Sequence, residues 1–578
     1  MKRLKERFDE VFLYDFEFSV EPGENPAPIC LVTMELFSRK VSRIGADQLI
    51  VGSVSPFEMG QKQLFVAYYA SAELGCHLAL DWPLPENVLD LFTEYRVHTN
   101  GGAWFGGNGL LDALTTYGVN AIGAHEKAEM RELAIRGGPY SSTERVALLD
   151  NCESEVQALK GLLAAMLPQI SLDHARNRGR YMKAVACMEH TGVPIDTENL
   201  RRIGIHGSAI KQKLIDRIDA PFNVYEGTTF KVANFERYLA QEKIPWERTV
   251  TGRLKLDGDT FQQRSDVYPQ LRPLKTLRST VSKLGNLKFT VGSDGRNRCL
   301  LSPFRSKTSR NQPSNAKFIF GAPRWMRGLI QPGSGRALAY LDYGQQEFGI
   351  AAALSRDEQM MTAYSSGDPY LEFAKQAGQA PPSATESSHS AVRARFKACV
   401  LAVQYGMGAQ SLAKRIGCSE LEGRALLALH RRTYPQFWSW SQAVVDYAQI
   451  YKRVFMVFDW RMRVSAATND RTLRNFPMQA NGAEMLRLAC CFCTEAGINV
   501  CAPVHDALLV EGPAGEIQEL ISEGQCHMRR ASEIVLDGFA LRTDAETTIA
   551  PQRFGREHEN EMWRIVFEII GGVEQGCS

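Results

Sequence analysis

The sequence predicts an α+β fold that is divided between two to four domains. Three observations lead to this prediction. The chain has 578 residues, which is too long for a single hydrophobic core. Residues 10–37 alternate strand-like apolar runs with turn residues. Residues 197–285 show helical patterns instead, and strands and helices alternate from there towards the C-terminus.

The N-terminal residues predict a β-hairpin. The apolar runs VFLYDFEFSV and ICLVTMELF flank the stretch EPGENPAP, whose Pro-Gly and Asn-Pro pairs favour a turn. We therefore expect two paired strands within residues 10–37. Helical patterns follow around Val88–Phe92 and over Thr143–Met166.

The middle of the chain is predicted to be mostly helical. A domain boundary is expected near residues 165–175. A helical stretch beginning with Tyr181–Glu189 should stop where Gly192 and Pro194 interrupt it. Residues 197–285 then form a second helical segment, which we expect to belong to the following domain.

The composition is that of a folded soluble protein, with 44% hydrophobic and 23% charged residues. The formal net charge of +2 neither demands nor excludes a polyanionic partner. No apolar run is long enough to cross a membrane, and the N-terminus MKRLKERFDE lacks a secretory signal. Thirteen scattered cysteines favour reduced thiols. These features predict a cytoplasmic protein without a membrane partner.

Local charge is more informative than net charge. Residues 295–341 contain nine Lys or Arg residues and no Asp or Glu. A local excess of this kind is what a phosphate-binding surface requires. The alternative is a solvated basic face. The nine residues are Arg296, Arg298, Arg305, Lys307, Arg310, Lys317, Arg324, Arg327 and Arg336.

Two aspartates near strand ends are candidate metal ligands. The apolar strand Leu338–Leu341 carries Asp342 to its end, and CAPVHDALLVEG, residues 501–512, predicts a hairpin with His505 and Asp506 at its turn. Burying a carboxylate without a partner is costly, whereas two carboxylates supply the oxygen ligands of a two-metal site. The alternative for Asp342 is a helix cap.

A predicted helix within residues 392–408 carries a stripe with cations at one end. Arg393, Lys397, Leu401 and Tyr405 are spaced by four, so they share one face, and the stripe extends about 18 Å at the helical rise. Cations for phosphates and a flat ring for a base suit a nucleoside triphosphate. The alternative is a basic amphipathic surface helix.

A further carboxylate pair lies in the N-terminal hairpin. Asp15 and Glu17 are two apart on a predicted strand, so both side chains project from one face. Oxygen-only ligands suit Mg²⁺ or Mn²⁺. The alternative is a solvated strand face.

With its surroundings, this pair resembles the DEDD-type 3′–5′ exonuclease family. The stretches AYYASAELGCHLAL and LLDNCESEVQAL resemble the second and third motifs of that family. The resemblance implies an RNase H-like fold with Asp15, Glu17, Glu73 and Glu155 as catalytic residues. It also implies two Mg²⁺ or Mn²⁺ ions, with Asp15 and Glu17 among their ligands. Glu155 stands where Asp is usual, and Asn151 where Tyr is usual.

The C-terminal residues resemble family A DNA polymerases of the bacterial DNA polymerase I type. The order LDYGQQEF, then R-x-x-x-K-x-x-x-L-x-x-x-YG, then VHDA is similar to motifs A, B and C of that family. Three other segments occur in the same order as in the family: MEHTGVPID, KTSRNQPSN and RTLRNFPMQ.

The resemblance implies a role for each motif residue. Asp342 and Asp506 would hold two Mg²⁺ ions and, with Lys397, form the catalytic set. The deoxynucleoside triphosphate (dNTP) would contact Arg393, Lys397, Leu401, Tyr405, Glu347 and Gln345, with Glu347 excluding ribonucleotides. Primer-template DNA would contact Arg310, Arg471, Asn475, Gln479 and His505.

Four positions depart from the family pattern. Gly344 replaces a Ser and Gln346 an Ile in motif A, and Leu401 stands where Phe is usual. Ala507 replaces the acid that follows His-Asp. That third carboxylate is secondary in the family, so two are expected to suffice here.

The resulting prediction is template-directed DNA synthesis with possible 3′–5′ proofreading. The alternatives are a polymerase with an inactive exonuclease domain, a single-subunit RNA polymerase or a DNA-binding scaffold. We expect a monomer, with replication accessory proteins as candidate partners, in a bacterial or virus-infected cell. The predicted domains are an exonuclease-like domain (1–168) and a right-hand polymerase domain (175–578), with thumb about 205–290, palm about 295–355 and 456–578, and fingers about 356–455.

Overall fold

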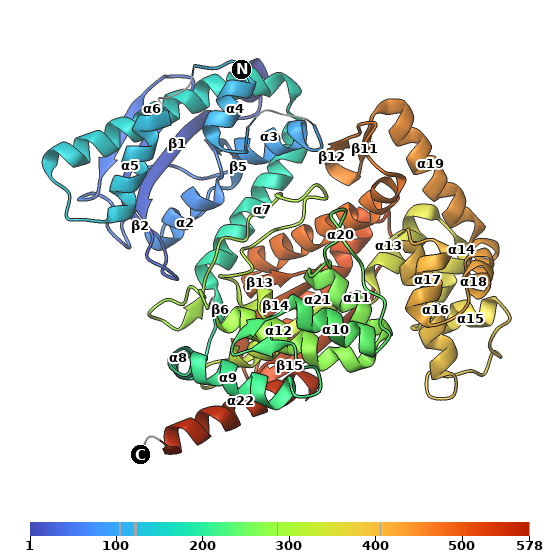
Figure 1. The fold of residues 1–578 in the computed structure, drawn as a ribbon. Helices are drawn as coiled ribbons and strands as arrows, with labels where there is room; N and C mark the ends of the chain where they lie inside the picture. The colour runs from blue at the N-terminus through green and yellow to red at the C-terminus, as the bar shows by residue number, and fades with distance from the viewer. Residues whose placement is uncertain (103–105, 121–123, 286, 405, 556, 577–578) are drawn as a thin grey trace.

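The structure is a computed structural model that describes residues 1–102, 106–120, 124–285, 287–404, 406–555 and 557–576. Figure 1 shows the N-terminal elements, in blue, gathered to one side of the molecule. Helices α14–α19 (residues 358–451), in yellow and orange, form the opposite side, α20 (Asp470–Glu495) lies between the two, and the red C-terminal helix α22 (Glu557–Gly576) lies at the lower edge. Both helices and sheets are present, which confirms the α+β prediction.

The N-terminal sheet has five strands in the order β3-β2-β1-β4-β5. The antiparallel pairing of β1 with β2 confirms the predicted hairpin, while β4 and β5 run parallel to β1. The strands are β1 (Glu10–Ser19), β2 (Ala27–Glu35), β3 (Val41–Gly45), β4 (Gln63–Ala67) and β5 (Asn87–Asp90).

The helix predicted around Val88–Phe92 is wrong for most of that span. Residues Asn87–Asp90 form strand β5, and helix α3 (Leu91–Thr99) begins only after it. Asp90 marks the change, because its carboxylate accepts hydrogen bonds from the backbone N–H groups of Phe92 and Thr93 and so caps α3. A short apolar run does not by itself distinguish a strand from a helix.

The predicted helix over Thr143–Met166 is confirmed as α6 (Ser142–Met166). It packs against β1 and β2, and α2 and α5 also pack against β1. The other N-terminal helices are α1 (Lys2–Lys5), α2 (Ser71–Ala79), α4 (Leu110–Thr116) and α5 (Ala124–Arg136).

Helix α7 (Leu172–Thr191) starts earlier than predicted and ends at Gly192 as expected. Gly192 has φ +64°, a left-handed conformation that favours glycine. The helix packs against α2 and β5 on the N-terminal side and against α20 and β13 on the other. The 3₁₀ turn η1 (Leu167–Gln169) lies within the region 165–175 where a domain boundary is predicted, and α7 packs against both halves of the chain.

The second helical segment is confirmed. A small hairpin, which the sequence did not predict, interrupts its helices, and α11 contacts α17 of the yellow region. The elements are α8 (Thr197–Ile205), α9 (Gly207–Ile218), β7 (Tyr225–Glu226), β8 (Thr229–Phe230), α10 (Val232–Gln241), α11 (Gly258–Val267), η2 (Pro269–Leu271) and α12 (Arg272–Leu284).

A four-stranded antiparallel sheet lies at the centre of the C-terminal half, in the order β13-β14-β10-β15. Helices α20 and α21 pack against it, so its apolar face is buried. The elements are β10 (Arg336–Tyr343), β13 (Asn499–Val504), β14 (Ala507–Pro513), β15 (Thr543–Ile549), α20 (Asp470–Glu495) and α21 (Ile517–Val535). The predicted strand and hairpin are both confirmed.

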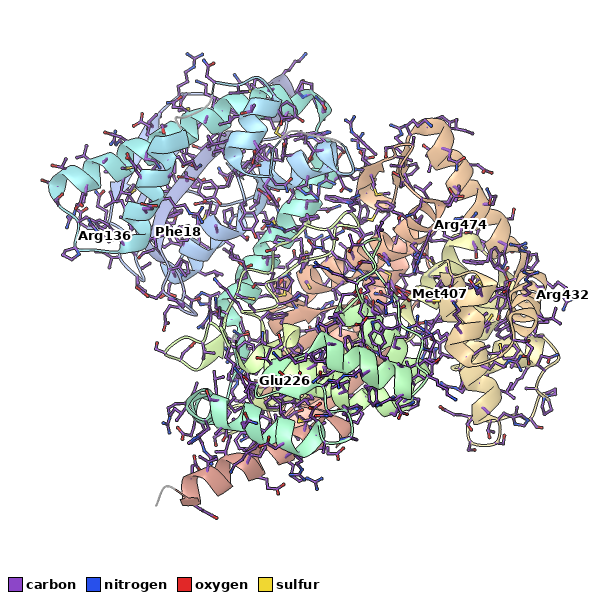
Figure 2. The ribbon with its side chains drawn as sticks, viewed as in Figure 1. Phe18, Arg136, Glu226, Met407, Arg432 and Arg474 are labelled. Atoms are coloured by element: carbon purple, nitrogen blue, oxygen red, sulfur yellow. The ribbon has the colours of Figure 1, made fainter. Side chains whose placement is uncertain are left out.

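A group of helices stands beside this sheet. Arg474 on α20, labelled in Figure 2, donates hydrogen bonds to Ser441 and Gln442 and so ties α20 to α19. The helices are α13 (Gln346–Ser355), α14 (Glu358–Ser365), α15 (Pro369–Gln376), α16 (Ser390–Gln404), α17 (Ala409–Ile416), α18 (Glu420–Thr433) and α19 (Pro435–Tyr451).

The remaining elements are short, apart from the last helix. No helix among the described residues is both long and apolar enough to cross a membrane. The elements are β6 (Val193–Pro194), β9 (Arg296–Asn297), η3 (Ile319–Gly321), η4 (Arg324–Leu329), β11 (Arg453–Phe455), η5 (Val457–Asp459), β12 (Arg461–Arg463) and α22 (Glu557–Gly576).

Candidate active sites

The structure brings Asp342 and Asp506 together at one end of the central sheet. Asp342 is the penultimate residue of β10, and Asp506 lies in the tight turn between β13 and β14. His505 takes φ +59° there, so the turn passes through a left-handed residue and brings Asp506 beside β10. Both carboxylates are half-buried.

The two carboxylates affect one another strongly. Burial, the charge of Asp506 and the charge of Asp544 raise the pKa of Asp342 to about 7. Burial raises the pKa of Asp506, while Arg310 and His505 act against that rise. Burial raises both pKa values, and neighbouring negative charge adds to the rise at Asp342, so a cation at this position would stabilise the ionised pair.

The two strands beside Asp342 carry different residues. On β14 the residue directly opposite Asp342 is Ala507, the position where the resemblance implies an acid. On β15 the residue directly opposite is Asp544. Directly opposed residues of antiparallel strands project from the same face, so Asp544 brings a third carboxylate to the Asp342 side of the sheet. Asp544 belongs to no local sequence motif, and only strand pairing places it opposite Asp342.

The Asp342–Asp506 site suits Mg²⁺. The Asp342 Oδ1 atom is buried and has no hydrogen-bond partner. A hard divalent cation prefers such carboxylate oxygens, and Mg²⁺ commonly combines one or two of them with water and substrate phosphates. No group of three or more His, Cys, Asp or Glu side chains within the described ranges could hold a metal by itself.

A cavity of about 320 Å³ opens directly beside Asp506. It brings together five of the residues that the sequence assigned to nucleotide or DNA binding, and it adds Tyr370, which the sequence analysis missed. Its lining residues are Arg310, Gln345, Gln346, Glu347, Phe348, Tyr370, Leu401, Gln404, His505 and Asp506.

The cationic stripe of α16 borders this cavity. The Lys397 ammonium lies 5.5 Å from the centre of the Tyr370 ring, and the Arg393 guanidinium lies 5.7 Å from it. Arg393 also pairs with Asp368 at 2.5 Å and with Glu386 at 3.0 Å, so two acids hold the side chain that was expected to bind phosphate. Tyr405 lies outside the described residues.

Gln345 has a structural partner that the sequence did not reveal. It caps α13 with φ +47°, and its Oε1 accepts a hydrogen bond of 2.7 Å from Arg542. Arg542 also donates to the Gly367 carbonyl at 2.8 Å, and its guanidinium lies over the ring of Tyr364. Because Arg542 follows no local motif, its role emerges only from the tertiary structure.

The predicted DNA-binding residues of α20 form one stripe. Arg471, Asn475 and Gln479 are four residues apart on this helix, and the buried Asn475 Oδ1 has no hydrogen-bond partner. The stripe continues to Ala483, which lines a second cavity of about 410 Å³ together with Arg310 and His505. The helical spacing thus connects the predicted DNA-binding residues of α20 with a cavity that Arg310 and His505 also line.

Some of the basic residues within 295–341 form ion pairs with acids of the same chain. Arg296 and Arg336 both pair with the buried Glu511, at 2.8 Å and 3.0 Å. Arg298 pairs with Asp294 at 2.6 Å. These three arginines therefore hold the fold together, and the prediction of a phosphate-binding surface depends on the other basic residues, Arg310 among them.

The four N-terminal carboxylates also come together, from three elements. Asp15 and Glu17 lie on β1, Glu73 lies on α2 and Glu155 lies on α6. Glu73 Oε2 accepts a hydrogen bond of 2.7 Å from the Phe16 backbone N–H, which fixes its carboxylate beside the strand. The sequence thus identified the carboxylates of this site correctly as neighbours.

Mutual repulsion and burial dominate this second site. Burial, followed by the charges of Glu155, Glu73 and Glu17, raises the pKa of Asp15 well above its usual value. Burial and the charge of Glu155 raise the pKa of Glu17 to about 7. The pKa of Glu73 is likewise raised, mainly by burial. The charge of Lys127, on α5, opposes all three of these rises.

The N-terminal site does not fit the two-metal arrangement that the resemblance implies. Lys127 Nζ lies 2.7 Å from Glu155 Oε2, and the Asn151 amide donates to Glu17 Oε1 at 2.6 Å. Nitrogen donors therefore face oxygens that a metal would need.

The C-terminal half of the chain is similar in sequence to known proteins. Residues 319–550 match the sequence profile of DNA polymerase family A. DNA polymerase I of Chloroflexus aurantiacus is 24% identical over 367 residues, which cover 57% of this chain and 38% of that protein. Thermostable DNA polymerase I of Thermus thermophilus is 24% identical over 382 residues, 60% of this chain and 45% of that protein. The chain thus spans less than half the length of these relatives.

The fold is similar to that of a solved structure, the POL domain of Pol1 from M. smegmatis in complex with a DNA primer-template and a dNTP. The similarity covers 94% of this chain and 96% of that chain, with a TM-score of 0.71 and 19% sequence identity. The similarity of fold therefore extends over nearly the whole chain.

Proposed function

We propose that this chain, which carries a DNA polymerase family A domain at residues 319–550, copies a DNA template by joining deoxynucleotides to a primer 3′ end. One observation carries the proposal. Asp342 and Asp506 meet beside a cavity of about 320 Å³ that also contains Glu347 and Leu401 and borders the cations of α16. These are the parts required for metal-assisted nucleotidyl transfer.

The carboxylates would hold two Mg²⁺ ions. Bound there, the ions supply Lewis acidity towards the attacking primer oxygen and the leaving pyrophosphate. The carboxylates keep their charge beside these cations, and Asp342 Oδ1 is already free to accept one. Asp544 would add negative charge on the same face without lying in the loop that carries Asp506.

The α16 stripe would bind the triphosphate. Lys397 is exposed beside Tyr370, so its ammonium is available for phosphate oxygens. Arg393 would exchange Asp368 and Glu386 for phosphate when a nucleotide arrives. Glu347, in the cavity wall, would crowd the sugar 2′ position and thereby favour deoxyribose.

The α20 stripe and Arg310 would contact the primer-template. Arg471, Asn475 and Gln479 present a cation and two amides along one face, which suits the acceptors of a minor groove. These acceptors occur at similar positions in every base pair, so the contacts would sense pairing geometry and not sequence. Cytoplasmic location and a monomeric state remain predictions.

A primer-extension assay with Mg²⁺ tests the proposal. We expect template-dependent addition of dNTPs to an annealed primer by the full chain. A single-subunit RNA polymerase would accept ribonucleotides equally, and a DNA-binding scaffold would add nothing. The Glu347→Ala variant should relax discrimination against ribonucleotides by about tenfold or more, because the carboxylate that excludes the 2′-hydroxyl is gone. Equal use of both nucleotide classes by the unmodified chain would contradict the proposal.

A further inference from the structure

We propose that Lys127 is the resident cation of the N-terminal carboxylate site and occupies it in place of divalent metal ions. The consequence is that the N-terminal domain does not cleave DNA by two-metal chemistry. The N-terminal domain would then serve as part of the scaffold of this chain. The inference concerns Asp15, Glu17, Glu73 and Glu155, and it does not depend on the polymerase proposal.

The first step is the position of the lysine. Lys127 Nζ contacts Glu155 Oε2 at 2.7 Å, and the two side chains are only 27% and 12% exposed. The pair therefore lies inside the site and not on its solvated rim. An ion pair at this degree of burial is screened much less than an exposed one.

The second step is that α5 holds the lysine in place. Arg136 at the other end of α5, labelled in Figure 2, pairs with Glu144 near the start of α6 at 2.7 Å. Lys127 pairs with Glu155, further along α6. Two ion pairs, one near each end of α5, thus fasten α5 to α6. Helix α5 also packs against β1, which carries Asp15 and Glu17.

The side-chain amide of Asn151 also hydrogen-bonds to carboxylate oxygens of this site. Asn151 is 8% exposed, and its Nδ2 donates to Glu17 Oε1 at 2.6 Å and to Glu155 Oε1 at 3.5 Å. Glu155 therefore has both oxygens engaged by nitrogen donors. A metal ion bound to Glu155 would therefore have to displace these nitrogen donors or share the oxygens with them.

The fourth step is the balance of charge. Four carboxylates and Lys127 face one another, and the lysine acts on Asp15, Glu17 and Glu73 as well as on its direct partner Glu155. One ammonium within this cluster offsets part of the carboxylate charge and so weakens the attraction for a divalent ion.

The chemistry follows from the kind of cation. An ammonium donates hydrogen bonds but is no Lewis acid, so it cannot coordinate a water oxygen and lower the pKa of that water as a metal does. Lys127 can neutralise the carboxylates without generating a nucleophile.

The experiment measures Mn²⁺ binding to the full chain by the electron paramagnetic resonance of free Mn²⁺. All proteins carry Asp342→Ala, which removes the polymerase site from the titration. Lys127→Met deletes the ammonium and keeps the aliphatic stem. Arg136→Met is the matched control, because it breaks the other ion pair between α5 and α6 without removing a cation from the site. Thermal unfolding of each variant verifies that it is folded.

We expect Lys127→Met to bind Mn²⁺ at least about tenfold more tightly than its parent. That gain should disappear when Asp15→Asn is added, and Arg136→Met should show no gain. The inference is overturned if the parent already binds Mn²⁺ and loses it with Asp15→Asn, a result that does not depend on whether Lys127→Met folds. It is also overturned if a folded Lys127→Met gains nothing.

A separate readout keeps this inference distinct from the proposed function. In the chain with an intact Asp342, Lys127→Met should extend a primer at the parental rate, because Lys127 lies in the N-terminal domain. A chain that extends no primer but behaves as expected with Mn²⁺ would refute the polymerase proposal alone. A chain that extends primers but binds Mn²⁺ at Asp15 would refute the Lys127 inference alone.

Discussion

The chain contains two clusters of buried carboxylates that differ in how their charge is balanced. At the end of the central sheet, Asp342 and Asp506 crowd together, and the Asp342 Oδ1 atom has no partner. In the N-terminal domain, Lys127 and Asn151 already engage Glu155 and Glu17. The first cluster needs a cation, whereas the second contains one.

This difference shows that residue identity alone does not make a metal site. Both clusters consist of acids placed on or beside a strand, and repulsion raises pKa values in each. What separates them is the second layer of contacts: an open cavity beside Asp506 and nitrogen donors beside Glu155. Catalytic competence therefore depends on which oxygens remain available.

The largest expected effect is on the rate of primer extension, which should depend on the central-sheet cluster and not on the N-terminal cluster. Asp342→Ala should lower the rate of primer extension by more than about 1000-fold, because it deletes a metal ligand from the reacting centre. Asp15→Ala should leave that rate unchanged. Single-nucleotide incorporation rates on a matched primer-template measure both. An active Asp342→Ala chain would show that the central-sheet cluster is not the synthetic site.

A smaller effect should distinguish the two faces of α16. Lys397→Ala should slow incorporation by about 100-fold, because one charge-assisted donor to the triphosphate is lost. Arg395→Ala is the matched control. Arg395 lies on the same helix but turns towards Glu422, 3.5 Å away, so its loss should change little. Similar rates for the two variants would disprove the predicted phosphate stripe.

Removing the third carboxylate beside Asp342 should change the Mg²⁺ requirement of primer extension by a still smaller amount. Asp544→Asn should raise the Mg²⁺ concentration needed for half-maximal extension by about fivefold, the effect of one nearby charge worth about 1 kcal/mol. Glu546→Gln is the control, since Glu546 lies opposite Tyr340, further from the pair. If both variants require the same Mg²⁺ concentration as the parent, Asp544 has no role at the site.

The smallest effect concerns pH and the N-terminal cluster. The folded-state pKa of Glu17 is raised to about 7, above its ordinary value of about 4.3, so the folded protein binds this proton more tightly than the unfolded chain. The stability that this proton contributes is therefore present at low pH and is lost as pH rises towards 7. Glu17→Gln should reduce the resulting fall in melting temperature by about 2–4 °C between pH 5 and 7.5. Parallel melting curves would contradict this assignment.

Much of both sites followed from local patterns. Asp342, Asp506 and the α16 stripe were identified because motif spacing fixes their place on a strand, a turn and a helix. The N-terminal hairpin and its Asp15–Glu17 pair were found in the same way. These features depend on periodicity, which is encoded within a few residues.

The features that were missed depend on contacts between distant segments. Asp544 reaches Asp342 only through strand pairing, and Arg542 reaches Gln345 across nearly two hundred positions of sequence. The role of Lys127 also depends on a contact between distant segments, because it requires α5 to pack beside α6. The helix predicted at Val88–Phe92 was wrong for a related reason, since sheet pairing with β4 decides that segment.

The most direct measurement follows a 5′-labelled primer with a 3′-terminal mismatch, annealed to its template and incubated with Mg²⁺. Without dNTPs we predict no shortened primer, because Lys127 occupies the N-terminal site; with dNTPs and a matched primer we predict extension that disappears in Asp342→Ala. Shortened primers produced by the unmodified chain but not by Asp15→Ala would contradict the division of roles between the two clusters.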